Sequence, residues 1–229
     1  MKVEVMSVVC GGSGPVLPNH ETATLIDNTA NLMTPCHAYQ KALEATDADI
    51  LVMLHDDVVV YDADWLTRIA VLFDNPNCVS AGFGGATSLG RPDLYRKPWN
   101  IWNMARGGYA SNQTDAEVHG ERFTGVRRVA VLDAFCMAVR VQWLRDRGGW
   151  PVEHLTHHVQ DLWLACEAAR DGKEIMMSGV DCLHRGGATS VSRKYAEAEW
   201  LQGGTLASDH VAPHVWLYNN YRDTLPITL

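Results

Sequence analysis

Two adjacent carboxylates directly follow an apolar run, and this pattern has the clearest chemical meaning in the chain. Residues 50–54 are all apolar, and the next three are His55, Asp56 and Asp57. A run of this length with β-branched residues is typical of a buried strand. Carboxylates at the exposed end of such a strand offer the oxygen ligands that Mg²⁺ or Mn²⁺ prefers, with positions left for phosphate oxygens. The alternative is an Asp-rich turn that caps the following helix.

Three further polar sites lie at the ends of predicted elements. Asp27 and Asn28 end an apolar segment, Asp161 opens a predicted helix, and His184 follows the last predicted strand. Each also has a purely structural interpretation, as turn formers, as a helix N-terminal charge and as a surface imidazole. Because ligands gather at the carboxyl ends of parallel strands, we expect all of these residues to converge on one edge of a sheet.

The elements that must position these residues begin with apolar segments at residues 3–9, 23–27 and 50–54. The last two segments flank a predicted helix at 35–45, which has Thr34 as its N-cap and Pro35 at its first position. Strand, helix and strand in this order indicate a parallel sheet with right-handed crossovers.

The rest of the chain continues this alternation around one long irregular stretch. Residues 87–125 are rich in Gly, Pro, Asn, Arg and aromatics, and loops of this length are usually functional or partly disordered. The pattern predicts helices at 64–73, 143–147 and 160–170, strands at 79–83, 128–139 and 175–180, and a covering helix or lid within 190–229. The last strand is expected to deliver Cys182, Leu183 and His184 to its end.

The stretch from 91 to 128 combines basic and aromatic side chains. It holds seven Arg or Lys residues against four Asp or Glu residues, with Trp99 and Trp102 among its aromatics. Such a mixture can stack on sugars, or can hold a phosphate backbone and stack on an unpaired base. The alternative is a solvated loop whose tryptophans pack onto the core.

The composition is that of one folded domain. Of the 229 residues, 47% are hydrophobic and 20% charged, and no apolar run reaches the ~20 residues of a membrane span, so we expect a cytoplasmic protein. The net charge of −8 argues against indiscriminate nucleic-acid binding, which needs a broadly basic surface. The six cysteines are spread singly, which favours buried free thiols over disulfides or a zinc site.

The order of these motifs resembles the family-two glycosyltransferases of the GT-A fold. The first half carries LIDN at 25–28, HAYQKAL at 37–43 and ADILVMLHDDV at 48–58; the second carries VLDAFCMAVR at 131–140, GGWP at 148–151, QDLWL at 160–164 and Leu183-His184. The resemblance covers about residues 1–187. It implies a single α/β, Rossmann-like domain with a mostly parallel sheet flanked by helices. Its parts would be a nucleotide-binding half (1–86), an acceptor-side loop (87–128), a catalytic half (129–189) and a C-terminal cover or lid (190–229).

The resemblance also implies roles for the polar residues. His55-Asp56-Asp57 stands at the position of the family's DxD motif, with His55 and Asp56 on the donor and Asp57 on the metal, and His184 matches a late histidine that completes the metal site. The other roles are nucleotide contact for Asp27 and Asn28, the catalytic base for Asp161, and contact with the acceptor or sugar for Asp133, Trp150, Trp99 and Trp102.

The chain departs from the family pattern at three places. His55 replaces the first acid of the motif, and Gln160 stands where an acid commonly precedes the base. Between the first two strands, the usual helix is expected to be reduced to a loop around residues 15–20.

The sequence thus predicts an enzyme that uses Mn²⁺ or Mg²⁺ to move a sugar from a nucleotide sugar, a UDP-sugar by expectation, onto a hydroxyl with inversion. The acceptor would be a saccharide or glycan, or a hydroxymethylated base in DNA, as for some phage enzymes. One alternative is a non-catalytic sugar-nucleotide-binding module, which the non-acidic His55 favours. Another is a metal-dependent nucleotidyltransferase, although the glycine-rich segment at 11–14 lacks the basic residue expected there.

Overall fold

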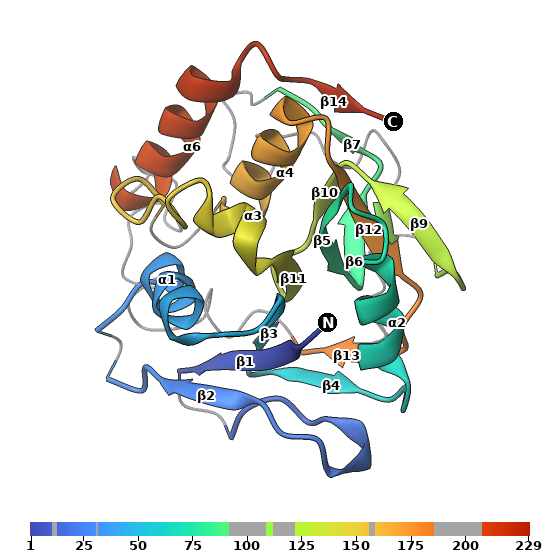
Figure 1. The fold of residues 1–229 in the computed structure, drawn as a ribbon. Helices are drawn as coiled ribbons and strands as arrows, with labels where there is room; N and C mark the ends of the chain where they lie inside the picture. The colour runs from blue at the N-terminus through green and yellow to red at the C-terminus, as the bar shows by residue number, and fades with distance from the viewer. Residues whose placement is uncertain (11–12, 31, 92–108, 112–121, 156–158, 186–207) are drawn as a thin grey trace.

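The computed structural model describes residues 1–10, 13–30, 32–91, 109–111, 122–155, 159–185 and 208–229, which Figure 1 draws in colour. Trp99 and Trp102 lie outside the described residues, as does most of the basic and aromatic stretch. The part of the 190–229 segment before residue 208 lies outside them as well. Predictions about those positions stay predictions.

A seven-stranded sheet forms the centre of the fold, in the order β2-β1-β3-β11-β5-β12-β9 (Figure 1). The strands are β2 (Thr24–Asp27), β1 (Val3–Val9), β3 (Ile50–His55), β11 (Cys136–Arg140), β5 (Cys78–Gly82), β12 (Glu174–Ser178) and β9 (Val126–Val129). β11 runs antiparallel to both β3 and β5, and β9 runs antiparallel to β12, whereas the other neighbours are parallel. The remaining five strands therefore share one direction, which confirms the predicted mostly parallel α/β sheet.

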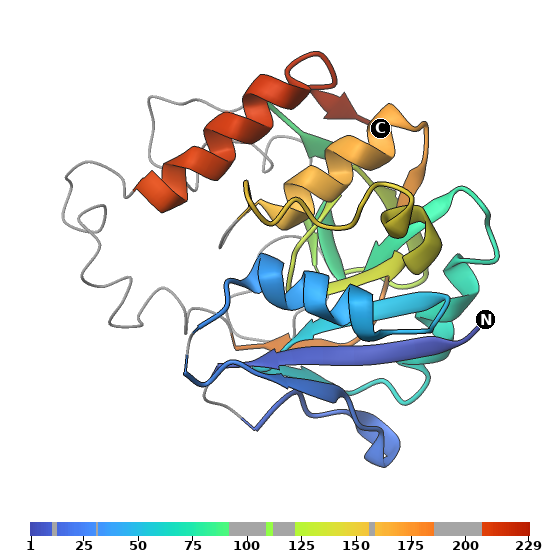
Figure 2. The same cartoon turned by 60° about the vertical axis from the view of Figure 1, so that its left-hand side comes forward.

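Helices cover both faces of this sheet, because alternate side chains of its central strands face two separate cores. In β3, Leu51 and Met53 pack into the core beneath α1, α3 and α4, whereas Ile50, Val52 and Leu54 pack into the core beneath α2. Figures 1 and 2 show the resulting layers. The helices are α1 (Pro35–Ala45), α2 (Trp65–Leu72), α3 (Val141–Arg145), α4 (Gln160–Arg170) and α6 (Ser208–Tyr221).

The predicted helices occur where local signals place them. α1 and α4 have the predicted bounds, 35–45 and 160–170. The Thr34 side chain accepts a hydrogen bond from the His37 N–H at 3.3 Å, as expected of an N-cap. α2 lies within the predicted 64–73, and α3 begins two residues before the predicted 143–147. In the described part of the segment between β1 and β2, the helix is the short 3₁₀ turn η1 (Pro18–His20), as expected.

The prediction of one strand at 128–139 is wrong. The chain forms β9, β10 (Val131–Leu132) and β11 there, and β10 leaves the large sheet to pair with β6 (Gly84–Ala86). The break between β10 and β11 is a turn at Asp133, whose Oδ1 accepts a hydrogen bond from the Phe135 N–H at 3.3 Å. A continuous apolar run conceals such a change of strand partner.

The expected position of His184 is also wrong in part. It does not end the strand predicted at 175–180 but lies in a separate strand, β13 (Cys182–His184), paired antiparallel with β4 (Val58–Val60). In this register His184 is opposite Val58, the residue after Asp57. The pairing brings two residues that are far apart in sequence side by side.

The helix expected within 190–229 is α6, which packs beside α4 (Figure 2). The Tyr221 hydroxyl donates to Glu167 of α4 at 2.5 Å, and the Arg170 guanidinium lies 3.9 Å above the Tyr221 ring. β14 (Ile227–Thr228) then pairs with β7 (Ser88–Leu89), which ties the end of the chain to the start of the long loop.

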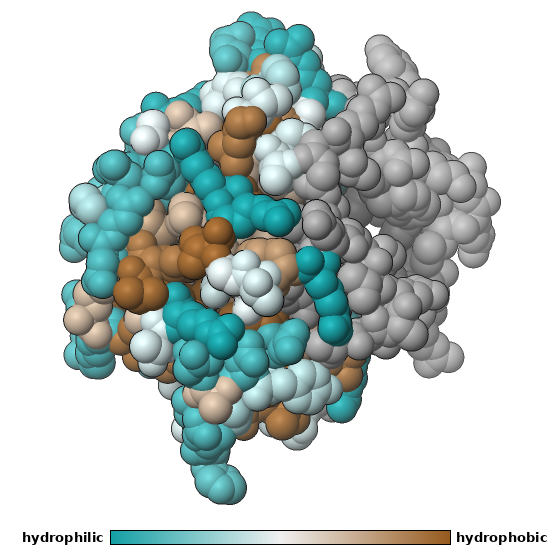
Figure 3. All heavy atoms as spheres, turned by 90° about the vertical axis from the view of Figure 1, so that its right-hand side faces the viewer, coloured by the Kyte–Doolittle hydropathy of each residue, from teal (hydrophilic) through white to brown (hydrophobic). Residues whose placement is uncertain are grey.

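Figure 3 shows the face formed by the β9 edge and α2, where apolar and polar side chains are interspersed. Val71 of α2 and Val126 of β9 are exposed. Charged side chains on an edge strand discourage further strand pairing, and β9 carries Arg127 and Arg128.

The cysteines agree with the sequence prediction, because five of the six are buried free thiols, and Cys10 is exposed. In the described ranges, no helix has the length and apolar character needed to span a membrane.

Candidate functional site

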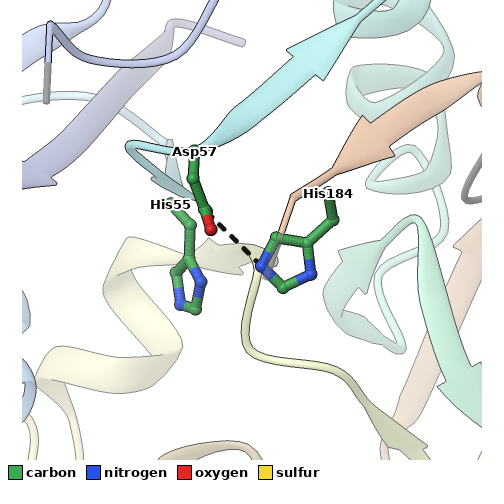
Figure 4. A group of neighbouring side chains, drawn as sticks. All are labelled: His55, Asp57 and His184. Carbon is green, nitrogen blue, oxygen red and sulfur yellow. Dashed lines mark ion pairs between the residues drawn. The ribbon is translucent and has the colours of Figure 1, made fainter. Parts of the chain in front are cut away.

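Two histidines and an aspartate meet beside the carboxyl end of β3. His55 ends β3, Asp57 precedes β4 and His184 ends β13, and one potential ligand atom from each lies within 4.8 Å of the others (Figure 4). Asp57 Oδ1 is 3.4 Å from His184 Nε2. We call these three residues the His-Asp-His cluster.

Main-chain pairing and ring packing hold the two imidazoles of the cluster. The His55 N–H donates to the carbonyl of Phe135 at 2.9 Å, which fixes the end of β3 against the start of β11. The Phe135 ring in turn stacks on His184, with centroids 4.7 Å apart. The His55 and His184 rings meet edge to face at 5.4 Å. The positions of both rings therefore follow from the pairing of β3 with β11 and of β13 with β4.

The cluster fits a divalent cation by a test internal to the structure. Asp57 Oδ1 is buried and, although His184 Nε2 lies 3.4 Å away, it accepts no hydrogen bond of good geometry from the described residues. A buried carboxylate oxygen without a donor is costly, and a cation bound at this position removes that cost. Two imidazoles and one carboxylate are also donors that divalent metals use in proteins.

The protonation states of the cluster suit this role. Burial raises the pKa of Asp57, but the neighbouring His184 and His55 lower it by more in total, so that the pKa lies below its ordinary value. Burial lowers the pKa of His55, and the charge of His184 lowers it further. At neutral pH, Asp57 is therefore an anion and His55 a neutral imidazole, which are the forms that bind metals.

Asp56, the middle residue of the predicted motif, faces the end of β1. Its Oδ2 accepts a hydrogen bond from the Cys10 N–H at 3.0 Å. The Cys10 sulfur lies 3.7 Å from the Asn28 amide nitrogen, within reach of a weak hydrogen bond. These contacts connect the ends of β2, β1 and β3, the region where the sequence predicts the nucleotide.

Asp27 and Asn28, the predicted nucleotide contacts, lie at the end of β2 in different environments. Asp27 is exposed, and hydrogen bonds from the Thr29 N–H and hydroxyl lower its pKa. Asn28 is 4% exposed, and its amide both donates to the Met33 carbonyl and accepts from the Met33 N–H at 2.9 Å. The Asn28 side chain thus holds the turn that leads into α1, and its contact with a nucleotide stays a prediction.

Asn28→Ala is expected to lower the free energy of unfolding by about 1 to 3 kcal/mol, because it leaves the Met33 main chain without its partners. Urea denaturation of the two proteins measures this difference. Thr29→Ala, an exposed change in the same turn, is the control and should have the smaller effect. Equal losses in the two variants would contradict a structural role for the buried amide.

Asp161, the predicted base, lies half-buried at the first turn of α4. Burial raises its pKa to about 7, and the negative charge of Asp133 acts in the same direction. The Leu162 N–H, which donates to Asp161 Oδ1 at 2.9 Å, opposes this change only in part. A carboxyl group with a pKa near neutrality is suited to accept a proton from a hydroxyl.

Asp133 acts electrostatically on both Asp161 and the His-Asp-His cluster. Its negative charge is among the influences that raise the pKa of His55 as well as that of Asp161. The turn between β10 and β11 therefore places Asp133 within electrostatic reach of both groups. The two halves of the predicted chemistry thus lie close together in the fold.

Two buried aromatic residues, Trp150 and Tyr39, pack at the interface of α1 and α4. Trp150, a predicted sugar contact, is 3% exposed and packs against Tyr39 and Trp163 with ring centroids at 5.8 and 5.2 Å. Its contact with a sugar stays a prediction, and packing between α1 and α4 is what the structure assigns to it. Sequence reasoning gave no role to Tyr39, whose hydroxyl pKa is raised by burial and next by Asp161. The helical spacing of Tyr39 with Cys36 and Leu43 places it on the buried face of α1, and this spacing was the signal in the sequence that pointed to it.

Comparisons with solved structures identify the fold. The chain is similar to the mannosyltransferase PcManGT from Pyrobaculum calidifontis in complex with GDP-Man and Mn²⁺, with a TM-score of 0.51 and 14% identity over 98% of this chain and 74% of that chain. It is also similar to GalNAc-T7 with UDP, GalNAc and Mn²⁺, with a TM-score of 0.53 and 7% identity over 80% of this chain and 44% of that chain. At these identities the likeness establishes the GT-A fold.

Sequence comparison establishes the family. Residues 21–201 match a family described as "Glycosyltransferase like family", and the chain belongs to it. A comparison with curated proteins finds no match. Family and fold together place the chain among the glycosyltransferase enzymes, as the order of its motifs predicts.

Proposed function

We propose that the protein transfers a sugar from a nucleotide sugar, preferentially a UDP-sugar, to a hydroxyl group with the help of a divalent cation. The observation that carries this proposal is the proximity of a cluster suited to a cation and a carboxyl group whose pKa is about 7, with Asp133 in electrostatic reach of both. The similar structures agree with it, because one is named with GDP-Man and Mn²⁺ and the other with UDP, GalNAc and Mn²⁺.

Each part of the site has a defined task in this reaction. Asp57 and His184 would hold Mn²⁺ or Mg²⁺, which neutralises the diphosphate leaving group when bound. The Asp161 carboxylate takes the proton of the acceptor hydroxyl while the acceptor oxygen bonds to the anomeric carbon. The bond from that carbon to the phosphate oxygen breaks, and the nucleoside diphosphate leaves with the electron pair. Attack opposite the leaving group inverts the anomeric centre.

The ends of β1, β2 and β3 are the proposed nucleotide site. Asp27 is exposed there for contact with the base or ribose. The hydrogen bond from the Cys10 N–H to Asp56 joins the end of β1 to the residue that lies between His55 and Asp57 of the His-Asp-His cluster. A nucleotide sugar lying across these ends would bring its diphosphate to the cluster. Asp133 is the proposed contact on the acceptor side, next to Asp161.

A saccharide or glycan is the first proposed acceptor, and a hydroxymethylated base in DNA is the second. The second has one observation in its favour, the exposed Arg122 and Arg128 at the end of the acceptor-side loop. In DNA binding these arginines would contact backbone phosphates, and such contacts weaken as the salt concentration rises. Failure to bind or modify hydroxymethylated DNA at low salt would remove this acceptor.

Hydrolysis of a panel of UDP- and GDP-sugars, with and without Mn²⁺, tests the proposed function. We expect turnover of one donor that requires the cation and stops when EDTA removes it. Binding of a donor without turnover, with every acceptor class supplied, would instead support a sugar-nucleotide-binding module. No binding of any donor would contradict the proposal, and release of diphosphate from a nucleoside triphosphate would favour a nucleotidyltransferase.

A further inference from the structure

The donor atoms of the His-Asp-His cluster are unusual for a site that would use Mg²⁺. Only one of its three side chains is a carboxylate, and the other two offer imidazole nitrogen. Mg²⁺ prefers oxygen ligands in octahedral geometry and gives up its water reluctantly, whereas imidazole suits first-row transition metals. The identity of residue 55 therefore bears on which cation the site selects.

The geometry places His55 in the cluster and not merely beside it. Figure 4 shows its side chain next to those of Asp57 and His184, and a ligand atom of each residue lies within 4.8 Å of the others. The main-chain hydrogen bond from the His55 N–H to the Phe135 carbonyl keeps the residue in the β3 register, and the edge-to-face contact with the His184 ring at 5.4 Å places the imidazole beside that residue.

The neighbouring carboxylates of Asp56 and Asp133 do not add oxygen ligands to the cluster. Asp56 uses Oδ2 to accept a hydrogen bond from the Cys10 N–H at the end of β1, and it is not part of the cluster. Asp133 accepts a hydrogen bond from the Phe135 N–H within its own turn. Within the described part of the chain, the cluster that can hold a metal contains Asp57 as its single acid.

We propose that His55 is a metal ligand and that it makes this site select a first-row transition-metal ion, Mn²⁺ or Co²⁺, over Mg²⁺. The inference rests on the proposed metal-assisted transfer, but it concerns binding and can be tested without turnover. Affinity for such sites rises from Mn²⁺ to Co²⁺, so the expected order is Co²⁺ above Mn²⁺, with Mg²⁺ weakest.

Direct binding measurements on the intact chain provide the test. Titration of Mn²⁺ followed by electron paramagnetic resonance gives the affinity, and electron spin echo modulation counts the histidine nitrogens coupled to the bound ion. We expect two coupled imidazoles in the wild type and one in His55→Asn, with affinity for Mn²⁺ lower in the variant by at least the roughly 10- to 100-fold that loss of an outer-shell partner costs. Calorimetry gives the affinities for Mg²⁺ and Co²⁺.

Two further variants make the result specific. His55→Asp supplies an oxygen ligand in place of the imidazole, so the preference for Mn²⁺ over Mg²⁺ should fall while metal binding persists. His20→Asn removes an exposed imidazole from the loop between β1 and β2, where a left-handed backbone tolerates Asn, and should leave the affinities unchanged. Circular dichroism and thermal unfolding confirm that each variant is folded.

The outcomes separate this inference from the proposed function. One coupled imidazole in the wild type, with unchanged Mn²⁺ affinity in His55→Asn, would overturn the role of His55 but leave metal-assisted transfer in place. Equal affinity of the wild type for Mg²⁺ and Mn²⁺ would overturn the selectivity. Absence of binding by every ion, with UDP or GDP present or not, would contradict both this inference and the metal-assisted reaction.

Discussion

Asp57→Ala is expected to reduce kcat for metal-dependent transfer by about 1000-fold or more, because a cation at the leaving group contributes several kcal/mol to the barrier and each ~1.4 kcal/mol changes the rate tenfold. Asp57 supplies the sole carboxylate of the cluster described above, and its buried Oδ1 has no other donor among the described residues. Initial rates across a range of Mn²⁺ concentrations measure the loss. Asp74→Ala, an exposed acid just after α2, is the matched control.

Thermal unfolding distinguishes loss of the cation from loss of the fold. In the wild type, Mn²⁺ at 100 times its Kd should stabilise the protein by about 2.7 kcal/mol through preferential binding to the folded state. Asp57→Ala should lose this stabilisation yet stay folded without metal, because the carboxylate it removes is half-buried and its Oδ1 makes no hydrogen bond with the described residues. A variant that keeps the Mn²⁺-dependent rise in Tm would contradict the assignment of Asp57.

Where the sequence predicts the fold well, the signals are local. α1 has a capping threonine and a proline at its start, and α4 has one apolar stripe, so their bounds follow from neighbouring residues alone. The unbroken apolar run of β3 likewise predicts a buried strand, and its side chains do pack into the cores on both faces of the sheet. Local capping and periodicity are sufficient in these segments because tertiary contacts reinforce them.

Where prediction fails, the deciding contacts are distant in sequence. The run at 128–139 looks like one strand, but its middle pairs with β6 and its end with β3 and β5. β13 is three residues long and is a strand because its backbone pairs with that of β4. No local pattern encodes such a partner.

The candidate site shows the same contrast between what local sequence predicts and what distant contacts decide. Asp57 and His184 were expected to meet, and the pairing of β4 with β13 brings them together by a route that the sequence does not indicate. His55 was expected on the donor side, yet it lies in the cluster, because residue type and position in a motif do not give interatomic distance. Trp150 illustrates the same limit, since an aromatic residue in a glycine turn can be buried as readily as exposed.

Asp161→Asn is expected to reduce kcat by about 100- to 10,000-fold, the usual contribution of a general base. In the wild type, kcat should rise about tenfold per pH unit below pH 7 and level off above it, because only the ionised carboxylate accepts a proton and its pKa is about 7. A pH profile of the rate with the preferred donor measures this. A rate independent of pH between 5.5 and 7 would assign the base elsewhere.

The same change should make the protein more stable above neutral pH, which loss of a merely structural carboxylate would not do. The pKa of Asp161 is raised from 3.8 to about 7 on folding, so the folded protein holds this proton more tightly than the unfolded chain. The resulting stability is fully present below pH 3.8 and is lost as the pH rises to about 7. At pH 8 the folded protein therefore carries a cost of about 2 to 4 kcal/mol, which the neutral amide of Asn removes.

Urea denaturation of wild type and Asp161→Asn at pH 4.5 and pH 8 measures this linkage. The difference in the free energy of unfolding should be small at pH 4.5 and should grow in favour of the variant at pH 8. Asp223→Asn, an exposed acid after α6, should show no such growth. A stabilised but inactive variant would mean that the site retains an unfavourable buried charge near Asp133 because the proton transfer requires it, whereas a destabilised one would make Asp161 a structural residue of α4.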